Sequence, residues 1–246
     1  MTGAPVKHGL SGYAVFGALL ASAGLPIYIH APKFYVDEYG VSLAALGAVL
    51  FALRMIDFVQ DPVLGWAAGR LQSSRRIWVG VAVAAMAVGM VGLFAVTPLL
   101  PPLAWFALTL TVLFTAFSFL TINFYARGVQ KAQDLGPRGH IRVATWRETG
   151  ALVGVCLAAI APTVLAGLTG SPFAVFAAGF CGLAVVAAFA MRREWSHVPP
   201  VGDSGFRQVL SDSIALRLLL IALVNATPVA VTSTLFLFFV ESRLGA

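Results

Sequence analysis

The chain has 246 residues, of which 59% are hydrophobic and only 11% are charged. Soluble domains average about 45–50% apolar and about 25% charged residues, so this chain has too few charges to cover a soluble surface. The composition excludes a disordered chain, a disulfide scaffold and a typical cytosolic enzyme, and it predicts an integral membrane protein. At roughly 20 apolar residues per spanning helix, the length allows about seven spans with short loops.

Seven apolar runs are long enough to cross a bilayer, and we expect each to be a helix because lipid cannot satisfy free backbone groups. They lie at about 10–31, 42–69, 77–97, 102–126, 143–168, 172–191 and 214–240. The longest polar stretch follows the sixth run. We therefore predict a six-helix bundle over residues 1–191, a cytoplasmic linker over 192–213, and a seventh spanning helix over 214–246.

The basic residues are distributed unevenly between the two predicted sides of the membrane. Thirteen of the sixteen fall on the side that holds the N-terminus, two fall on the other side, and Arg54 lies within a span. This bias predicts a multi-pass protein of the cell (inner) membrane with a cytoplasmic N-terminus and a C-terminus outside. The net charge of +6 then reflects topology, with anionic membrane lipid as the expected partner, and nothing supports nucleic-acid binding.

The second predicted helix carries three charged residues within eight positions, namely Arg54, Asp57 and Asp61. Asp57 and Asp61 are four residues apart and share a helix face, whereas Arg54 and Asp57 are three apart. Intramembrane charges are costly, so these side chains should face the bundle interior or a cavity. Two interpretations stand at this point: a site for Na⁺ or a proton, or a structural polar cluster that contains an Arg54–Asp57 ion pair.

Other polar residues allow both packing and functional interpretations. Helix four carries a stripe of Thr111, Thr115, Ser118 and Tyr125, which could pack against neighbouring helices or line a cavity. Arg147 opens helix five, where it could snorkel to water or bind a ligand. The sequence has no phosphate-binding loop, no metal-spaced His or Cys set and no nucleophile–base arrangement, so we predict neither an enzyme nor a bound cofactor.

Two segments of the chain form specific motifs: the Arg-x-x-Asp-x-x-x-Asp-Pro-x-x-Gly pattern of helix two and the start of helix five. Together with four further segments they form the following set: Leu25-Pro26-Ile27-Tyr28, Pro32-Lys33-Phe34-Tyr35, Gly40-Val41-Ser42, Arg54-Met55-Ile56-Asp57, Asp61-Pro62-Val63-Leu64-Gly65 and Arg142-Val143-Ala144-Thr145-Trp146-Arg147-Glu148. This set resembles the glycoside–pentoside–hexuronide:cation symporters of the major facilitator superfamily, whose familiar member is melibiose permease.

The resemblance implies roles for particular residues. It makes Asp57 and Asp61 ligands of the coupling cation, Na⁺ or H⁺, with Thr121 at the position of a further family carboxylate and Arg54 as a supporting ion-pair partner. It implies a solute site with Arg147, Tyr125 and Tyr28. The loop after helix two would supply a gate of Gly65, Arg70, Arg75 and Arg76, although Gly69 stands where the superfamily usually has an acid. Because Ala21 and Thr121 replace two sugar-binding acids, a less hydroxylated or anionic solute is expected in place of a galactoside.

The implied function is cation-coupled symport of a sugar-like or other small organic solute by alternating access. Since family members are expected to have twelve helices, the chain resembles an N-terminal half plus helix seven, which would need the remaining spans or a second chain to transport. The alternative is a truncated or degenerate membrane module that does not transport alone and binds a partner chain.

Overall fold

The six predicted spans of the N-terminal region fold as long apolar helices. The structure, a computed structural model, describes residues 9–196, 211–225 and 228. Residue contacts divide the chain into a unit of residues 1–198 and a unit of residues 199–246. No strand occurs among the described residues, and six of their helical runs are long and apolar enough to cross a membrane. The prediction of an all-α protein is therefore confirmed.

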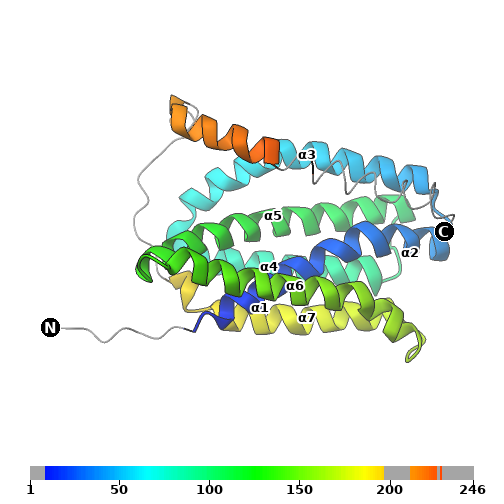
Figure 1. Cartoon of the computed structure of the whole chain (residues 1–246). Coiled ribbons are helices and arrows are strands. Elements are labelled where there is room, and N and C mark those ends of the chain that lie inside the picture. Colours follow the sequence, from blue (N-terminus) through cyan, green and yellow to red (C-terminus); the bar gives the residue numbers. More distant parts are fainter. Residues whose placement is uncertain (1–8, 197–210, 226–227, 229–246) are drawn as a thin grey trace. The chain divides into compact units, whose positions relative to one another are not determined.

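The first unit is a bundle of helices that run alternately up and down (Figure 1). Its elements are α1 (Ser11–Leu25), η1 (Pro26–His30), α2 (Ala31–Tyr39), α3 (Leu43–Arg70), η2 (Gln72–Ser74), α4 (Arg75–Phe94), α5 (Pro102–Asp134), α6 (Gly139–Ala166), α7 (Pro172–Met191) and η3 (Glu194–Ser196). The second unit contains one apolar helix over Ser213–Asn225 among its described residues. The later part of the predicted span 214–240 lies outside the described residues.

The first span is longer than predicted and changes its winding midway. Helix α1 continues through the π-helical segment η1 into α2, so the run extends to Tyr39 rather than ending near residue 31. Proline has no backbone N–H to donate, and the change begins at Pro26. The run ends at Gly40, whose φ of 64° lies in the left-handed region that glycine adopts without strain. Ser42 then caps α3 by accepting a hydrogen bond from the Ala45 N–H.

Helix α5 is also longer than the sequence suggested. We predicted an end near residue 126, but the helix continues to Asp134. That prediction was wrong because it ended the helix where the apolar run ended, while Arg127 and Lys131 are good helix formers that continue it. Both side chains are consequently fixed on one helix face, one turn apart, and both are buried.

Helices α1 and α6 make the closest helix–helix approach of the bundle. A Cβ atom on Gly150 would collide with the Ala14 carbonyl, and one on Gly154 would collide with the Ala18 backbone. Small residues allow backbones to approach in this way within membranes, where dispersion contacts replace the hydrophobic effect as the driving force. This contact holds Arg147, near the start of α6, beside α1: a Cβ on Gly17 would lie 2.7 Å from the Arg147 carbonyl oxygen.

Replacing Gly150 with alanine should therefore force α1 and α6 apart. We expect the free energy of unfolding to fall by at least about 1–3 kcal/mol, the usual cost of overpacking, because the clashing atom belongs to backbone and cannot rotate away. Thermal unfolding of the purified chain in detergent measures the effect. Gly179→Ala in α7 is the matched control, since a Cβ there meets nothing within 4 Å. Equal stability of both variants would contradict the close packing.

Candidate functional site

A cavity of about 290 Å³ lies where η1, α3 and α5 meet. Its wall includes Tyr28 from η1, the charged residues Arg54, Asp57 and Asp61 from α3, and Thr121 from α5. The structure thus gathers five residues that the sequence nominated for cation binding, solute binding or support. The i, i+3 and i, i+4 spacing on α3 turns all three charged side chains toward the same space.

Arg54 joins the charged and aromatic parts of this wall. Its Nη1 donates to Asp57 Oδ2 at 3.3 Å. The guanidinium also lies over the Tyr28 ring at 4.8 Å and over the Phe114 ring at 5.4 Å. The Asp57 side chain is 14% exposed and that of Arg54 is 54% exposed, so the carboxylate lies deeper than its partner. The predicted ion pair is present, and it uses only one of the two Asp57 carboxylate oxygens.

Thr121 presents an unpartnered oxygen to the same cavity wall. Its Oγ1 is buried and has no hydrogen-bond partner in the part of the chain that the structure describes. Buried polar atoms are rarely left unpaired, so this hydroxyl requires an explanation. Two carboxylates and a hydroxyl are oxygen donors of the kind that hard cations prefer. The arrangement can therefore bind Na⁺ through oxygen ligands, or it can hold a proton between carboxylates.

The remaining polar side chains of α5 divide between packing and the cavity. Thr111 donates to the Ala107 carbonyl at 2.7 Å, and Thr115 donates to the Thr111 carbonyl at 2.8 Å. Thr115 also receives a hydrogen bond from Gln60 of α3 at 3.1 Å. These bonds fit the packing interpretation for both threonines. Ser118, by contrast, lines the cavity beside Thr121.

Two residues predicted for the solute site, Arg147 and Tyr125, are absent from the lining of this cavity. They form a separate pair, in which the Arg147 guanidinium stacks over the Tyr125 ring at 4.2 Å. Arg147 also donates from Nε and Nη2 to Glu148 Oε1, at 2.8 and 2.6 Å. An anionic solute would therefore have to compete with Glu148 for the guanidinium, a contact that was not predicted from the sequence.

The residues predicted as a loop gate do not share one contact. Arg70 stacks over Trp66 at 4.4 Å, and Arg76 is exposed at the start of α4. Arg75 is only 4% exposed, and its Nε and Nη1 have no hydrogen-bond partner among the described residues. Gly65 faces open space. The gating role of these four residues stays a prediction.

A buried ionic cluster that was not predicted from the sequence is formed by Tyr13, Arg127, Lys131 and Glu194. Glu194, in the turn after α7, accepts hydrogen bonds from Lys131 Nζ at 2.7 Å, Arg127 Nη2 at 3.2 Å and the Tyr13 hydroxyl at 3.4 Å. All four side chains are buried. The cluster ties α1, α5 and the segment after α7 together at one end of the bundle, so the start of the predicted linker packs against the bundle.

Burial alone would raise the pKa of the Glu194 carboxyl. The hydrogen bond and charge of Lys131, joined by those of Arg127, outweigh it and hold the pKa below its ordinary value of 4.5. One sequence signal could have revealed the cluster. Arg127 and Lys131 stand four residues apart, which places two cations on one helix face and calls for a buried acid opposite them.

Comparison with known proteins agrees with this architecture. A family model described as MFS/sugar transport protein matches residues 10–246. No curated protein and no solved structure matches the chain. The six apolar helices of the first unit fit the six-helix bundle of the major facilitator superfamily, and the match supports a multi-pass membrane transporter, not an enzyme. The chain thus belongs to the MFS/sugar transport protein family of the major facilitator superfamily.

Proposed function

We propose that this chain serves cation-coupled symport, in which a sugar-like or other small organic solute crosses the cell membrane together with Na⁺ or H⁺. One observation carries the proposal: Asp57, Asp61 and the unpartnered Thr121 hydroxyl line the same cavity. Charged side chains inside spanning helices are costly and commonly mark ion or proton pathways.

The proposed coupling follows from the charges of this cavity. Asp57 and Asp61 share a face of α3, so their carboxylates repel each other until a cation or a proton is bound. Binding would remove that repulsion and favour a solute-competent arrangement of the helices. Arg54 already offsets part of the charge of Asp57. This ion pair lowers the electrostatic free energy of the cavity when no cation is bound. Rocking of the bundle about the loaded site would complete alternating access.

The proposed solute contacts are Arg147 and Tyr125, which form a stacked pair, and Tyr28, which lines the cation cavity. Guanidinium groups recognise carboxylates and hydroxyls well, and aromatic rings pack on apolar ring faces. The positive-inside pattern supports a cytoplasmic N-terminus and a C-terminus outside. Membership of the melibiose permease branch and the need for a second helical bundle both stay predictions.

Binding of radiolabelled Na⁺ to the purified full chain in detergent, measured between pH 5.5 and 8.5, tests the cation site without requiring transport. We expect saturable binding that Thr121→Val weakens about tenfold, because a ligand oxygen worth roughly 1.4 kcal/mol is lost. Thr111→Val is the matched control, since that hydroxyl is bonded to its own helix and Thr111 does not line the cation cavity.

If the coupling ion is a proton, Na⁺ will not bind and the chain will instead take up protons from a weakly buffered solution as the pH is lowered. Asp57→Asn should then take up fewer protons than the unmodified chain over the same pH interval, while the other carboxyls and the four histidines still titrate. Neither Na⁺ binding nor Asp57-dependent proton uptake in a monodisperse protein would contradict the proposal and favour a membrane module that does not transport.

A further inference from the structure

A second and larger cavity, of about 820 Å³, lies at the end of the bundle that the charge pattern places outside. It is formed where α2, the loops around Val96 and Ser171, and the ends of α4, α6 and α7 meet. Its volume lies within the range of small-molecule sites, about 300–1,000 Å³. Nothing in the proposed symport mechanism uses it.

One wall of this cavity is a cluster of aromatic rings. Phe94 and Phe173 stack with ring centroids 5.3 Å apart, and Phe34 lies 5.0 Å from Phe173. His30 approaches Phe173 at 6.1 Å. The four rings come from different elements, η1, α2, α4 and α7, so their packing defines a fixed wall. Aromatic faces carry partial negative charge and attract cations that can shed their water, which small alkylated ammonium groups do readily.

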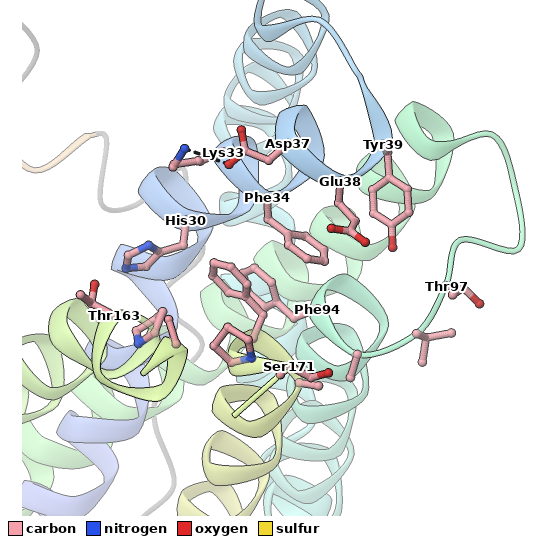
Figure 2. Close-up of a pocket in the computed structure, with 18 of the residues that line it drawn as sticks. His30, Lys33, Phe34, Asp37, Glu38, Tyr39, Phe94, Thr97, Thr163 and Ser171 are labelled. Atoms are coloured by element: carbon pink, nitrogen blue, oxygen red, sulfur yellow. Dashed lines mark hydrogen bonds and ion pairs between the residues drawn. The ribbon is translucent and has the colours of Figure 1, made fainter. Parts of the chain in front are cut away.

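Of the two carboxylates that line this cavity, one is paired with a lysine and the other is not. Lys33 Nζ pairs with Asp37 Oδ2 at 2.8 Å, which neutralises both groups at the rim (Figure 2). Glu38 has no hydrogen bond or ion pair among the described residues, and Figure 2 shows its carboxylate on the aromatic side of the pocket. His30 adds a buried Nε2 that lacks a partner in the described part of the chain. The wall is thus aromatic and bears one uncompensated negative charge.

We infer that this outer cavity binds a quaternary or alkylated ammonium group, with the cation between the Phe34 and Phe173 rings and the Glu38 carboxylate. Aromatic rings and a carboxylate together suit such a cation better than they suit an anion or a metal ion. A ligand hydroxyl that reached His30 would supply the hydrogen bond that Nε2 lacks. The ammonium group could belong to a free amine or to the headgroup of a choline lipid.

Binding of radiolabelled choline to the purified full chain in detergent tests the inference. We expect saturable binding that Glu38→Gln weakens about tenfold, since one charge–charge contact near the surface is lost. Phe173→Leu should weaken it about threefold or more through loss of a ring face. Lys33→Gln should strengthen binding several-fold, because it frees the Asp37 carboxylate. Asp134→Asn, an exposed acid at the other end of the bundle, should change nothing.

A neutral isostere distinguishes charge from shape. The alcohol 3,3-dimethylbutan-1-ol has the size of choline without its charge, and it should compete at least tenfold more weakly. Reconstitution in nanodiscs separates the two sources of the group: choline binding that falls when phosphatidylcholine replaces phosphatidylglycerol indicates a lipid headgroup, and unchanged binding indicates a free amine. No saturable binding, equal competition by the alcohol, or a loss caused by Asp57→Asn in place of Glu38→Gln would overturn the inference.

Discussion

Replacing Glu194 with glutamine is expected to lower the free energy of unfolding by about 3 kcal/mol, within the range measured when one partner of a buried ion pair is removed. The variant keeps the size of the side chain but removes its charge, which leaves Arg127 and Lys131 buried beside a neutral amide. Two buried cations without an anion repel each other and have lost their water. The segment after α7 would then separate from α5.

Heating the purified variant in detergent and following the monodisperse fraction measures this loss. For a chain of this size, a loss of about 3 kcal/mol in the free energy of unfolding lowers the midpoint temperature of thermal unfolding by about 6–12 °C. Glu148→Gln is the matched control, because Glu148 also pairs with an arginine but its side chain is 56% exposed, and exposed pairs contribute little. Adding Lys131→Met to Glu194→Gln should restore part of the stability. Similar midpoints for both glutamine variants would show that the cluster does not stabilise the bundle.

Lowering the pH should destabilise the unmodified protein in the same way as the Glu194→Gln substitution, because it protonates the Glu194 carboxylate. The pKa of Glu194 is lowered on folding, so its contribution is complete above the ordinary carboxyl pKa of 4.5 and is lost as the pH falls through the lower folded value. The midpoint of the unmodified chain should therefore decline more steeply below pH 4.5 than that of Glu194→Gln. The two curves should converge at the acid end.

The spans were predictable from the sequence because membrane burial imposes a length and a hydropathy on every helix. Helix α7 begins and ends at the predicted residues, 172 and 191. The ends of the first and fourth spans were not predictable in the same way. Helix α5 runs eight residues beyond its apolar run through the helix formers Arg127 and Lys131, and the acid that pairs with both of them, Glu194, is distant in sequence.

Part of the candidate site was likewise predictable from the sequence, and part of it was not. Local spacing on α3 placed Arg54, Asp57 and Asp61 together, since i, i+3 and i, i+4 neighbours share a face. Thr121 and Tyr28 were assigned through family resemblance, and both line the same cavity. The pairing of Arg147 with Glu148 and its stacking on Tyr125 depend on side-chain conformations that neither spacing nor resemblance specifies.

Asp57→Asn and Arg54→Gln should change cation affinity in opposite directions. Removing the Asp57 charge deletes a carboxylate from the cavity, and we expect Na⁺ affinity to fall about 100-fold, given that a charge pair near 4 Å is worth up to about 4 kcal/mol at an effective dielectric of 20. Removing the Arg54 charge deletes a competitor that sits 3.3 Å from the same carboxylate. Affinity should then rise, by about 3- to 10-fold, because this guanidinium is partly exposed and water screens it.

The opposite signs separate a cation site from a structural cluster. If Arg54 and Asp57 served only to stabilise α3, breaking their ion pair from either side would have the same consequence, namely lower stability and no specific change in Na⁺ binding. Radiolabelled Na⁺ titrations of both variants distinguish the two cases, with Arg138→Gln as the control at an exposed arginine that does not line the cavity. Should Na⁺ affinity fall equally in both, Arg54 would be acting by holding Asp57 in place, and its charge would not oppose the cation.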